Sequence, residues 1–199
     1  MVWASFLVAT AAVSGLFVIG DRGTAPPLAS VASREPGGRL QPSSGGIEQG
    51  RWTSIVIHHS GLPGGTPESI DREHRSYGYA GLGYHFLIGN GRGLDDGAIH
   101  AGPRWNLQQP GAHVAPRAGG ATPDADELNR TSIGICLIGN GSREEFTARQ
   151  MTELVALVRR LQQELEIPAS AVHLHSDLAA VESPGPLFPA AAFANAILD

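Results

Sequence analysis

The chain has 199 residues, of which 42% are hydrophobic, and a formal net charge of −5 at neutral pH. This length favours one folded domain with additional segments, and the hydrophobic content is sufficient for a core. The negative charge and the lack of a Lys/Arg cluster exclude a typical nucleic-acid-binding surface, so we expect no nucleic-acid partner. We also expect the protein to be a monomer. The single cysteine, Cys136, excludes an intrachain disulfide, and its place in an apolar run predicts a buried strand residue.

The N-terminus is hydrophobic. Residues 2–20 carry no charge and are almost entirely apolar. A run of this length lies within the range of about 17–25 residues that can span a bilayer. We interpret residues 1–20 as a hydrophobic anchor or an export signal, and the lack of Lys or Arg before the apolar run favours an uncleaved anchor. The sequence therefore predicts an exported or membrane-anchored protein.

Residues 21–50 are rich in Pro, Gly and Ser and contain few large apolar side chains, as in Pro36-Gly37-Gly38 and Ser43-Ser44-Gly45-Gly46. Such a segment cannot bury enough apolar surface to offset the entropy cost of ordering. We predict a disordered linker over residues 21–50, followed by one folded domain over residues 51–199.

Within this domain, strand and helix patterns alternate, which predicts an α/β fold with helices on the faces of a sheet. Thr66 before Pro67 predicts a helix N-terminus, and that helix extends to about residue 77. Thr147 and Gln150 form a capping box that opens a helix to about residue 166, and Pro189 opens a last helix. Residues 102–131 are predicted to form a long loop, which in compact domains is usually functional. The predicted strands are residues 54–58, 84–88, 98–101, 132–138 and 172–175.

Two histidine pairs lie at the ends of predicted strands. His58 and His59 follow the apolar run Ile55–Ile57, and alternation along a strand lets only one of them serve a given site. His173 and His175 share a face, and this spacing is typical both of two metal ligands and of a polar strand end. The spacing alone leaves open a zinc site and a set of structural histidines.

Three further residues are interpreted from their places in the predicted elements. His113 lies in the predicted long loop and is a candidate for ligand contact. Tyr84 begins a predicted strand, so its hydroxyl either reaches a cleft or belongs to an aromatic side chain that fills the core. His74, in the first predicted helix, is interpreted as a solvated or capping residue.

Five segments, in this order, resemble landmarks of the family that contains peptidoglycan recognition proteins and phage-lysozyme-type amidases. The resemblance covers nearly the whole predicted domain and implies the fold of that family, a mixed central β-sheet flanked by helices. The segments are residues 52–60, 81–89, 111–113, 132–140 and 175–185.

The resemblance also implies an activity. Active members of this family are zinc-dependent N-acetylmuramoyl-L-alanine amidases, which cut the amide between the lactyl group of the glycan and L-alanine of the stem peptide. Carried over by position, His58 and His175 are zinc ligands, and Tyr84 orients or activates the zinc-bound water. His113 is expected in the peptidoglycan groove. The implied cofactor is Zn²⁺, the implied partners are peptidoglycan or muropeptides, and the domain is expected to face the periplasm or cell wall.

His59 and His85 directly follow His58 and Tyr84 in these landmarks, and we expect both to contact substrate.

Two positions depart from the family pattern. The third zinc ligand, usually cysteine, falls on Ser183, whose hydroxyl stays protonated at neutral pH and is a poor zinc ligand. The residue that assists the oxyanion falls on Val181, which has no donor to offer. Candidates to replace the third ligand are His173, Glu182 and His59. We therefore predict an amidase-family protein with impaired hydrolysis and keep, as the alternative, a recognition module that binds peptidoglycan without cutting it.

Overall fold

The computed structural model describes residues 40–42, 45–115 and 125–198. The described residues belong to one compact unit. The predicted N-terminal anchor and most of the predicted linker lie outside the described residues. Within the described ranges, no helix is both long and apolar enough to cross a membrane.

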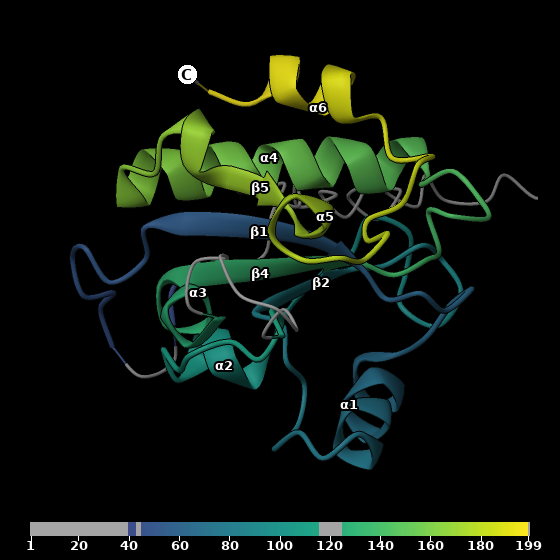
Figure 1. The fold of residues 1–199 in the computed structure, drawn as a ribbon, viewed down its shortest axis with the longest axis horizontal. Helices are drawn as coiled ribbons and strands as arrows, with labels where there is room; N and C mark the ends of the chain where they lie inside the picture. Colours follow the sequence, from purple (N-terminus) through teal and green to yellow (C-terminus); the bar gives the residue numbers. More distant parts are fainter. Residues whose placement is uncertain (1–39, 43–44, 116–124, 199) are drawn as a thin grey trace, which may run out of the picture. The chain divides into compact units, whose positions relative to one another are not determined.

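The centre of the fold is a five-stranded sheet with the order β3-β2-β4-β1-β5 (Figure 1). β1, β4, β2 and β5 pair in parallel, whereas β3 pairs antiparallel with β2, so the sheet is mixed as the family resemblance implied. The strands are β1 (Ser54–His59), β2 (Phe86–Ile88), β3 (Ile99–Ala101), β4 (Ser132–Leu137) and β5 (Val172–Leu174).

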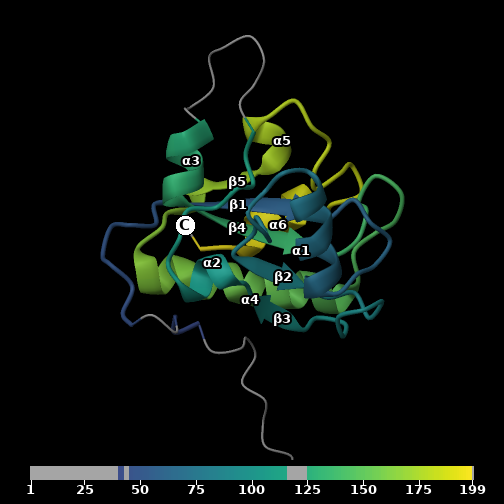
Figure 2. The same ribbon diagram turned by 90° about the horizontal axis from the view of Figure 1, so that it is seen from below.

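Helices cover both faces of this sheet (Figure 1). α4 (Ala148–Leu165) lies along one face, with α6 (Ala190–Ala196) beside it. Figure 2, turned by 90° and seen from below, shows the face away from α4, where α1 (Pro67–Ser76) and α3 (Ala125–Thr131) lie. The short helices are α2 (Pro103–Asn106), η1 (Ala169–Ala171) and α5 (His175–Leu178).

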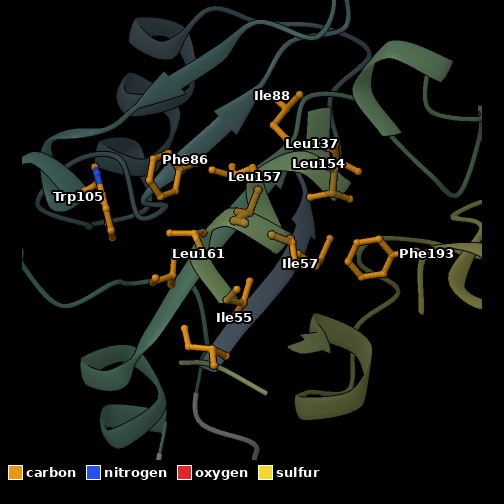
Figure 3. Packing of buried hydrophobic residues seen from close by; sticks show 14 of the residues in the cluster. Ile55, Ile57, Phe86, Ile88, Trp105, Leu137, Leu154, Leu157, Leu161 and Phe193 are labelled. Atoms are coloured by element: carbon orange, nitrogen blue, oxygen red, sulfur yellow. The ribbon is translucent and has the colours of Figure 1, made fainter. Parts of the chain in front are cut away.

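Alternation along β1 assigns its side chains to the two faces. Ile55 and Ile57 pack with Leu154, Leu157 and Leu161, which recur every three to four residues along α4 (Figure 3). The alternate residue Val56 belongs to a separate apolar cluster, which includes Leu128 of α3 and Leu178 of α5. The next residue on this second face is His58, so the same alternation that builds the core directs this imidazole away from α4.

The predicted helix starts are confirmed. Thr147 and Gln150 form a reciprocal capping box, and Thr66 caps α1 directly before Pro67. Gln150 also donates from its side-chain amide to the carbonyl oxygens of Ile88 and Ile138. One buried amide therefore both caps α4 and attaches it to the ends of two neighbouring strands.

Two predictions about local structure are wrong. Residues 102–131 are not one long loop, because the short helices α2 and α3 lie within this range. His175 does not end a strand; β5 stops at Leu174 and His175 begins α5. There the Asp177 carboxylate accepts the N–H of Leu174 at 2.9 Å. Helices this short have no hydrophobic repeat by which the sequence could reveal them.

The folded part begins before Arg51. Leu40 is 1% exposed and belongs to the main core cluster. Its carbonyl oxygen accepts a hydrogen bond of 2.7 Å from the indole of Trp105. Ile47 packs against the same cluster. Parts of the segment predicted as linker thus pack against the domain, through the side chains of Leu40 and Ile47.

Candidate functional site

Most of the predicted site residues come together at the carboxyl ends of adjacent parallel strands. His58 lies near the end of β1, and His175 directly follows β5, the neighbour of β1. The carboxyl ends of parallel strands are where α/β sheets commonly place ligands. The rings of His58 and His175 are 4.3 Å apart between centroids. The sequence prediction that these two imidazoles form one site is consistent with this placement.

His58 is the centre of a cluster of rings that it forms with Tyr84, His113 and His175. Its side chain is 1% exposed, and the centroid of its ring lies 5.1 Å from the ring centroid of Tyr84 and 5.1 Å from that of His113. Nε2 of His58 is 3.2 Å from Nδ1 of His113, which is hydrogen-bonding distance. His58 therefore has a direct polar partner from a segment 55 positions away.

His113 is buried, with 6% exposure. Its second ring nitrogen, Nε2, lies 3.3 Å from the carbonyl oxygen of Ser132. The ring rests over Gly134 of β4, where a Cβ would come within 2.7 Å of the imidazole Cδ2. Both ring nitrogens of His113 thus have partners inside the protein, and direct contact with a ligand, as expected from the sequence, would require the side chain to move.

His175 has an unpaired nitrogen. Its Nε2 atom is buried and has no hydrogen-bond partner among the described residues. Burial lowers the pKa of this imidazole to about 4, assisted by the nearby His59. A neutral ring with an unpaired buried nitrogen is available to bind a donor or a cation.

Ser183, on which the resemblance places the third ligand, makes a structural contact. The backbone N–H of His59 donates a hydrogen bond of 2.9 Å to the Ser183 hydroxyl. Ser183 is 8% exposed, so it lies inside the protein beside the chain that carries His58. Val181 is 43% exposed and has only an apolar side chain. These two positions lack both the thiolate and the oxyanion donor of the family pattern.

Two of the three substitute ligands proposed from the sequence, His59 and Glu182, have other hydrogen-bond partners. Nδ1 of His59 accepts the N–H of Gly141 at 3.1 Å. The Glu182 carboxylate is exposed and accepts a hydrogen bond of 2.8 Å from Ser142. His173 lies within β5, in register with Val56 of β1. His59 and Glu182 are thus engaged in holding the loop that contains Ser183.

The ring of Tyr84, to which the resemblance assigns the orientation or activation of the reacting water, lies 5.1 Å from the ring of His58 between centroids. Burial raises the pKa of its phenol well above the ordinary value, and a hydrogen bond to the Cys136 thiol contributes in the same direction. The phenol therefore stays protonated at neutral pH and can donate a hydrogen bond. On its other side lies the ring of His74, 5.1 Å away between centroids.

His85 is fully buried and has protein partners at both ring nitrogens. Nδ1 accepts the N–H of Gly134 at 2.9 Å, and Nε2 lies 3.1 Å from the carbonyl oxygen of Gln109. This side chain connects the start of β2 to β4 and to the segment after α2. Such a role differs from the substrate contact expected from the sequence, for which His85 would have to leave these partners.

The cluster is uncharged at neutral pH. Burial holds the pKa of His58 well below its ordinary value, and the neighbouring His113 and His175 act in the same direction. Burial also lowers the pKa of His113 to about 4 and that of His85 well below its ordinary value. Neutral imidazoles offer lone pairs, which is the form that binds metals and accepts hydrogen bonds.

The residues fit part of a zinc site. His58 and His175 are neutral and adjacent, and the unpaired Nε2 of His175 is the kind of atom that a metal would satisfy. However, no group of three His, Cys, Asp or Glu side chains among the described residues is arranged to hold a metal ion. A serine hydroxyl in the third position does not supply the anionic donor that zinc sites use. The donor set as it stands therefore does not form the complete family site.

A cavity of about 560 Å³ is lined by the chain neighbours of His113 on both sides, but not by His113 itself or by His58, Tyr84 or His175. The cavity is lined by the segment that carries His113, by residues of α3 and by Tyr79. The lining residues are Tyr79, Pro110, Gly111, Ala112, Val114, Ala115, Asp126, Asn129 and Arg130. A larger cavity of about 920 Å³ is lined by residues 47–50, 52 and 53 and by the end of α4, and it likewise contains no residue of the histidine cluster.

Sequence reasoning missed two positioning contacts. The side-chain oxygen of Asn129 in α3 accepts the N–H groups of His113 and Val114, each at 3.0 Å, and so fixes the segment that carries His113. Nδ1 of His74 accepts the N–H of Gly83 at 2.8 Å, directly before Tyr84. An Asn in a predicted loop and a His in an amphipathic helix carry no local signal for such distant contacts.

The sequence profile of the N-acetylmuramoyl-L-alanine amidase family matches residues 48–186. The chain belongs to this family. The family's match spans every strand of the sheet and both histidines at the strand ends, His58 and His175. The resemblance inferred from the five sequence segments is thereby confirmed.

Individual proteins similar to this chain are amidases or peptidoglycan recognition proteins. Peptidoglycan-recognition protein SC2 of Drosophila simulans is 27% identical over 164 residues, which are 78% of this chain and 79% of the relative. The amidase LysC of Clostridium intestinale URNW is 32% identical, with a TM-score of 0.59 over 72% of this chain and 83% of LysC. The complex of peptidoglycan recognition proteins LCa and LCx with tracheal cytotoxin contains a chain that is 26% identical, with a TM-score of 0.53 over 77% of this chain and 88% of that one. This amidase family thus includes both amidases and recognition proteins among the relatives of the chain.

Proposed function

We propose that this protein binds peptidoglycan fragments as a recognition module, with little hydrolysis of the amide between the muramoyl lactyl group and L-alanine. One observation carries the proposal: the hydroxyl of Ser183, in the place of the family's third zinc ligand, is engaged by the backbone of His59. Val181 adds a second missing function, because an alkyl side chain cannot donate to an oxyanion. Loss of one such donor typically costs about 10²–10³ in rate.

The cavity beside His113 is the proposed binding surface for the muropeptide. It combines an aromatic ring, Tyr79, with the exposed guanidinium of Arg130, which also pairs with Glu127. Aromatic faces pack against the apolar sides of sugars and peptides, and polar groups around them fix orientation. The related complex supports the ligand class only, because there tracheal cytotoxin is bound by peptidoglycan recognition proteins of the same fold.

The test is calorimetric titration of the full-length protein with purified muropeptides, followed by chromatography of the same mixtures for released stem peptide. We expect saturable binding and no more than slow release. Tyr79→Ala should weaken binding about tenfold, which corresponds to about 1.4 kcal/mol. Tyr77→Ala is the matched control, because Tyr77 is 69% exposed and does not line the cavity. Equal affinities of the two variants, or no binding at all, would contradict the proposal.

Amide hydrolysis dependent on Zn²⁺ is the second candidate. It is favoured by the unpaired Nε2 of His175 beside His58, since a pure binding module has little need of that arrangement. Rapid release of stem peptide by the unmodified protein in the presence of zinc, abolished by His175→Ala, would make hydrolysis the main function.

We also propose that residues 1–20 retain the protein at a membrane and that the domain faces the periplasm or cell wall. The uncharged run of residues 2–20 and the wall-directed family support this location. Fractionation of cells that express the full chain, with and without residues 1–20, tests it. Recovery of both forms in the cytosolic fraction would contradict the proposal.

A further inference from the structure

His74, in the last turn of α1, is half-buried and contacts two tyrosines. The centroid of its ring lies 5.6 Å from the ring centroid of Tyr79 and 5.1 Å from that of Tyr84. Aromatic rings that pack against each other have separations of this size. Tyr79 lines the cavity proposed to bind the muropeptide, whereas Tyr84 belongs to the ring cluster around His58. One side chain therefore contacts both the proposed binding surface and the cluster.

His74 also holds the backbone next to each of these tyrosines. Its carbonyl oxygen accepts the N–H of Tyr79 at 3.1 Å. Its ring atom Nδ1 accepts the N–H of Gly83 at 2.8 Å, directly before Tyr84. The chain that leaves α1 thus returns to the same residue before β2 begins, and the two tyrosines lie at the two ends of this short excursion.

Gly83 is attached on both sides. Its carbonyl oxygen accepts the N–H of Ala112 at 3.0 Å, and Ala112 lines the cavity. A Cβ at position 83 would lie 2.5 Å from the carbonyl oxygen of Ala112, so the two segments approach this closely only because residue 83 is a glycine. The Asp71 carboxylate, one turn before His74 in α1, accepts the N–H of Leu82 at 2.8 Å. Two side chains of α1 therefore fix two successive amides before Tyr84.

We propose that His74 is a positioning residue that fixes Tyr79 of the binding cavity relative to Tyr84 of the ring cluster. The inference rests on the proposed function for the identity of the ligand. While Nδ1 of His74 holds the Gly83 N–H, the two tyrosine rings keep one mutual arrangement in the free protein. A binding surface that is already ordered loses less conformational freedom when the ligand binds, which strengthens the complex.

The first test uses the tyrosines themselves. The chain has three, Tyr77, Tyr79 and Tyr84, so labelling the full-length protein with 3-fluorotyrosine gives three ¹⁹F signals. His74→Phe keeps an aromatic ring but removes the acceptor of the Gly83 N–H. We expect this variant to shift or broaden the signals of Tyr79 and Tyr84 together, and to leave unchanged that of the exposed Tyr77, which is the internal control. A change at only one of the two rings, at neither, or equally at all three would overturn the proposal.

A second measurement needs no variant and decides the question even if His74→Phe does not fold. In the unmodified protein, nuclear Overhauser contacts are expected between the ring protons of His74 and those of both Tyr79 and Tyr84. A protein in which His74 contacts only one of the two rings in solution would not hold them in a fixed arrangement, and the proposal would be wrong.

The functional consequence is measured in the muropeptide titration. His74→Phe should weaken binding about tenfold, a typical effect of leaving a hydrogen-bonding group without its partner. His74→Asn, whose amide oxygen lies near the place of Nδ1, should weaken it less. Because His74 acts through Tyr79, the double variant His74→Phe/Tyr79→Ala should bind no more weakly than Tyr79→Ala alone, whereas independent effects would multiply to about 100-fold. Arg72→Ala, exposed on the same helix, is the control and should bind normally.

Multiplied losses in the double variant, or equal losses in His74→Phe and His74→Asn, would show that His74 only supports the fold and would overturn the proposal. If the unmodified protein binds no muropeptide, the proposed function fails, while the fluorine spectra still decide whether His74 holds the two tyrosine rings.

Discussion

The backbone N–H of His59 and the hydroxyl of Ser183 are joined by a hydrogen bond of 2.9 Å, although 124 positions separate them in the chain. This bond holds the loop after α5 beside the end of β1, one residue from His58. The hydroxyl of Ser183 thus has a structural partner next to His58, and a serine hydroxyl is a poor zinc ligand.

The double variant Val181→Thr/Ser183→Cys should gain both zinc and activity. A cysteine at position 183 supplies a thiolate, and threonine at position 181 supplies a donor to the oxyanion. We expect about one zinc per chain by elemental analysis after dialysis, and release of stem peptide about 10²–10³ faster than in the unmodified protein. Ser170→Cys is the control, because Ser170 is exposed in η1 and its thiol lies outside the site. Bound zinc without a gain in rate would show that these two positions do not limit hydrolysis.

Gly134→Ala should destabilise the protein, although alanine usually suits a strand better than glycine does. The added Cβ would overlap the His113 ring, and overpacking of this kind costs about 1–3 kcal/mol of unfolding free energy. Urea denaturation followed by circular dichroism measures the change. Gly46→Ala, where a Cβ meets no atom within 4 Å, should leave stability unchanged. Equal stabilities of the two variants would contradict the tight packing of His113 against β4.

The metal-free protein should lose stability as the pH falls from about 6.5 to 4. The unfolded chain binds protons at its histidines near pH 6.5, whereas burial lowers the pKa of His113 in the folded protein to about 4. Between these values the unfolded state holds more protons, so the unfolding free energy decreases with decreasing pH. For His113 alone the integrated loss is about 3 kcal/mol. Urea denaturation in the presence of a chelator, at several pH values across this range, provides the measurement, and a flat profile would refute the buried neutral state.

Leu40→Ala should cost about 2–5 kcal/mol of unfolding free energy, because Leu40 is fully buried in the main core cluster. The hydrogen bond from Trp105 goes to the backbone carbonyl and is retained in the variant, so the loss reports side-chain packing. Leu107→Ala is the matched control; Leu107 is 54% exposed, and its loss should change stability by no more than about 0.5 kcal/mol. A neutral effect of Leu40→Ala would place the start of the domain after this segment, at the boundary predicted from composition.

Local patterns in the sequence predicted the larger elements well. The alternation around Ile57 and the capping box of Thr147 with Gln150 identified β1 and the start of α4, because both depend on residues within one turn or one strand. The short helices α2, α3 and α5 were missed, since each has too few residues for a hydrophobic repeat. The order of five motifs was sufficient to indicate the family, and His58, Tyr84 and His175 do lie together.

By itself, the sequence determined the family, the sheet and the absence of a cysteine and an oxyanion donor at positions 183 and 181. Only the tertiary structure decided what the remaining histidines do. His113 and His85 looked like groove residues, yet their ring nitrogens meet Ser132, Gln109 and Gly134 in the interior. These contacts depend on how distant segments pack against one another, and residue type and spacing along the chain carry no information about which nitrogen of an imidazole will find a partner.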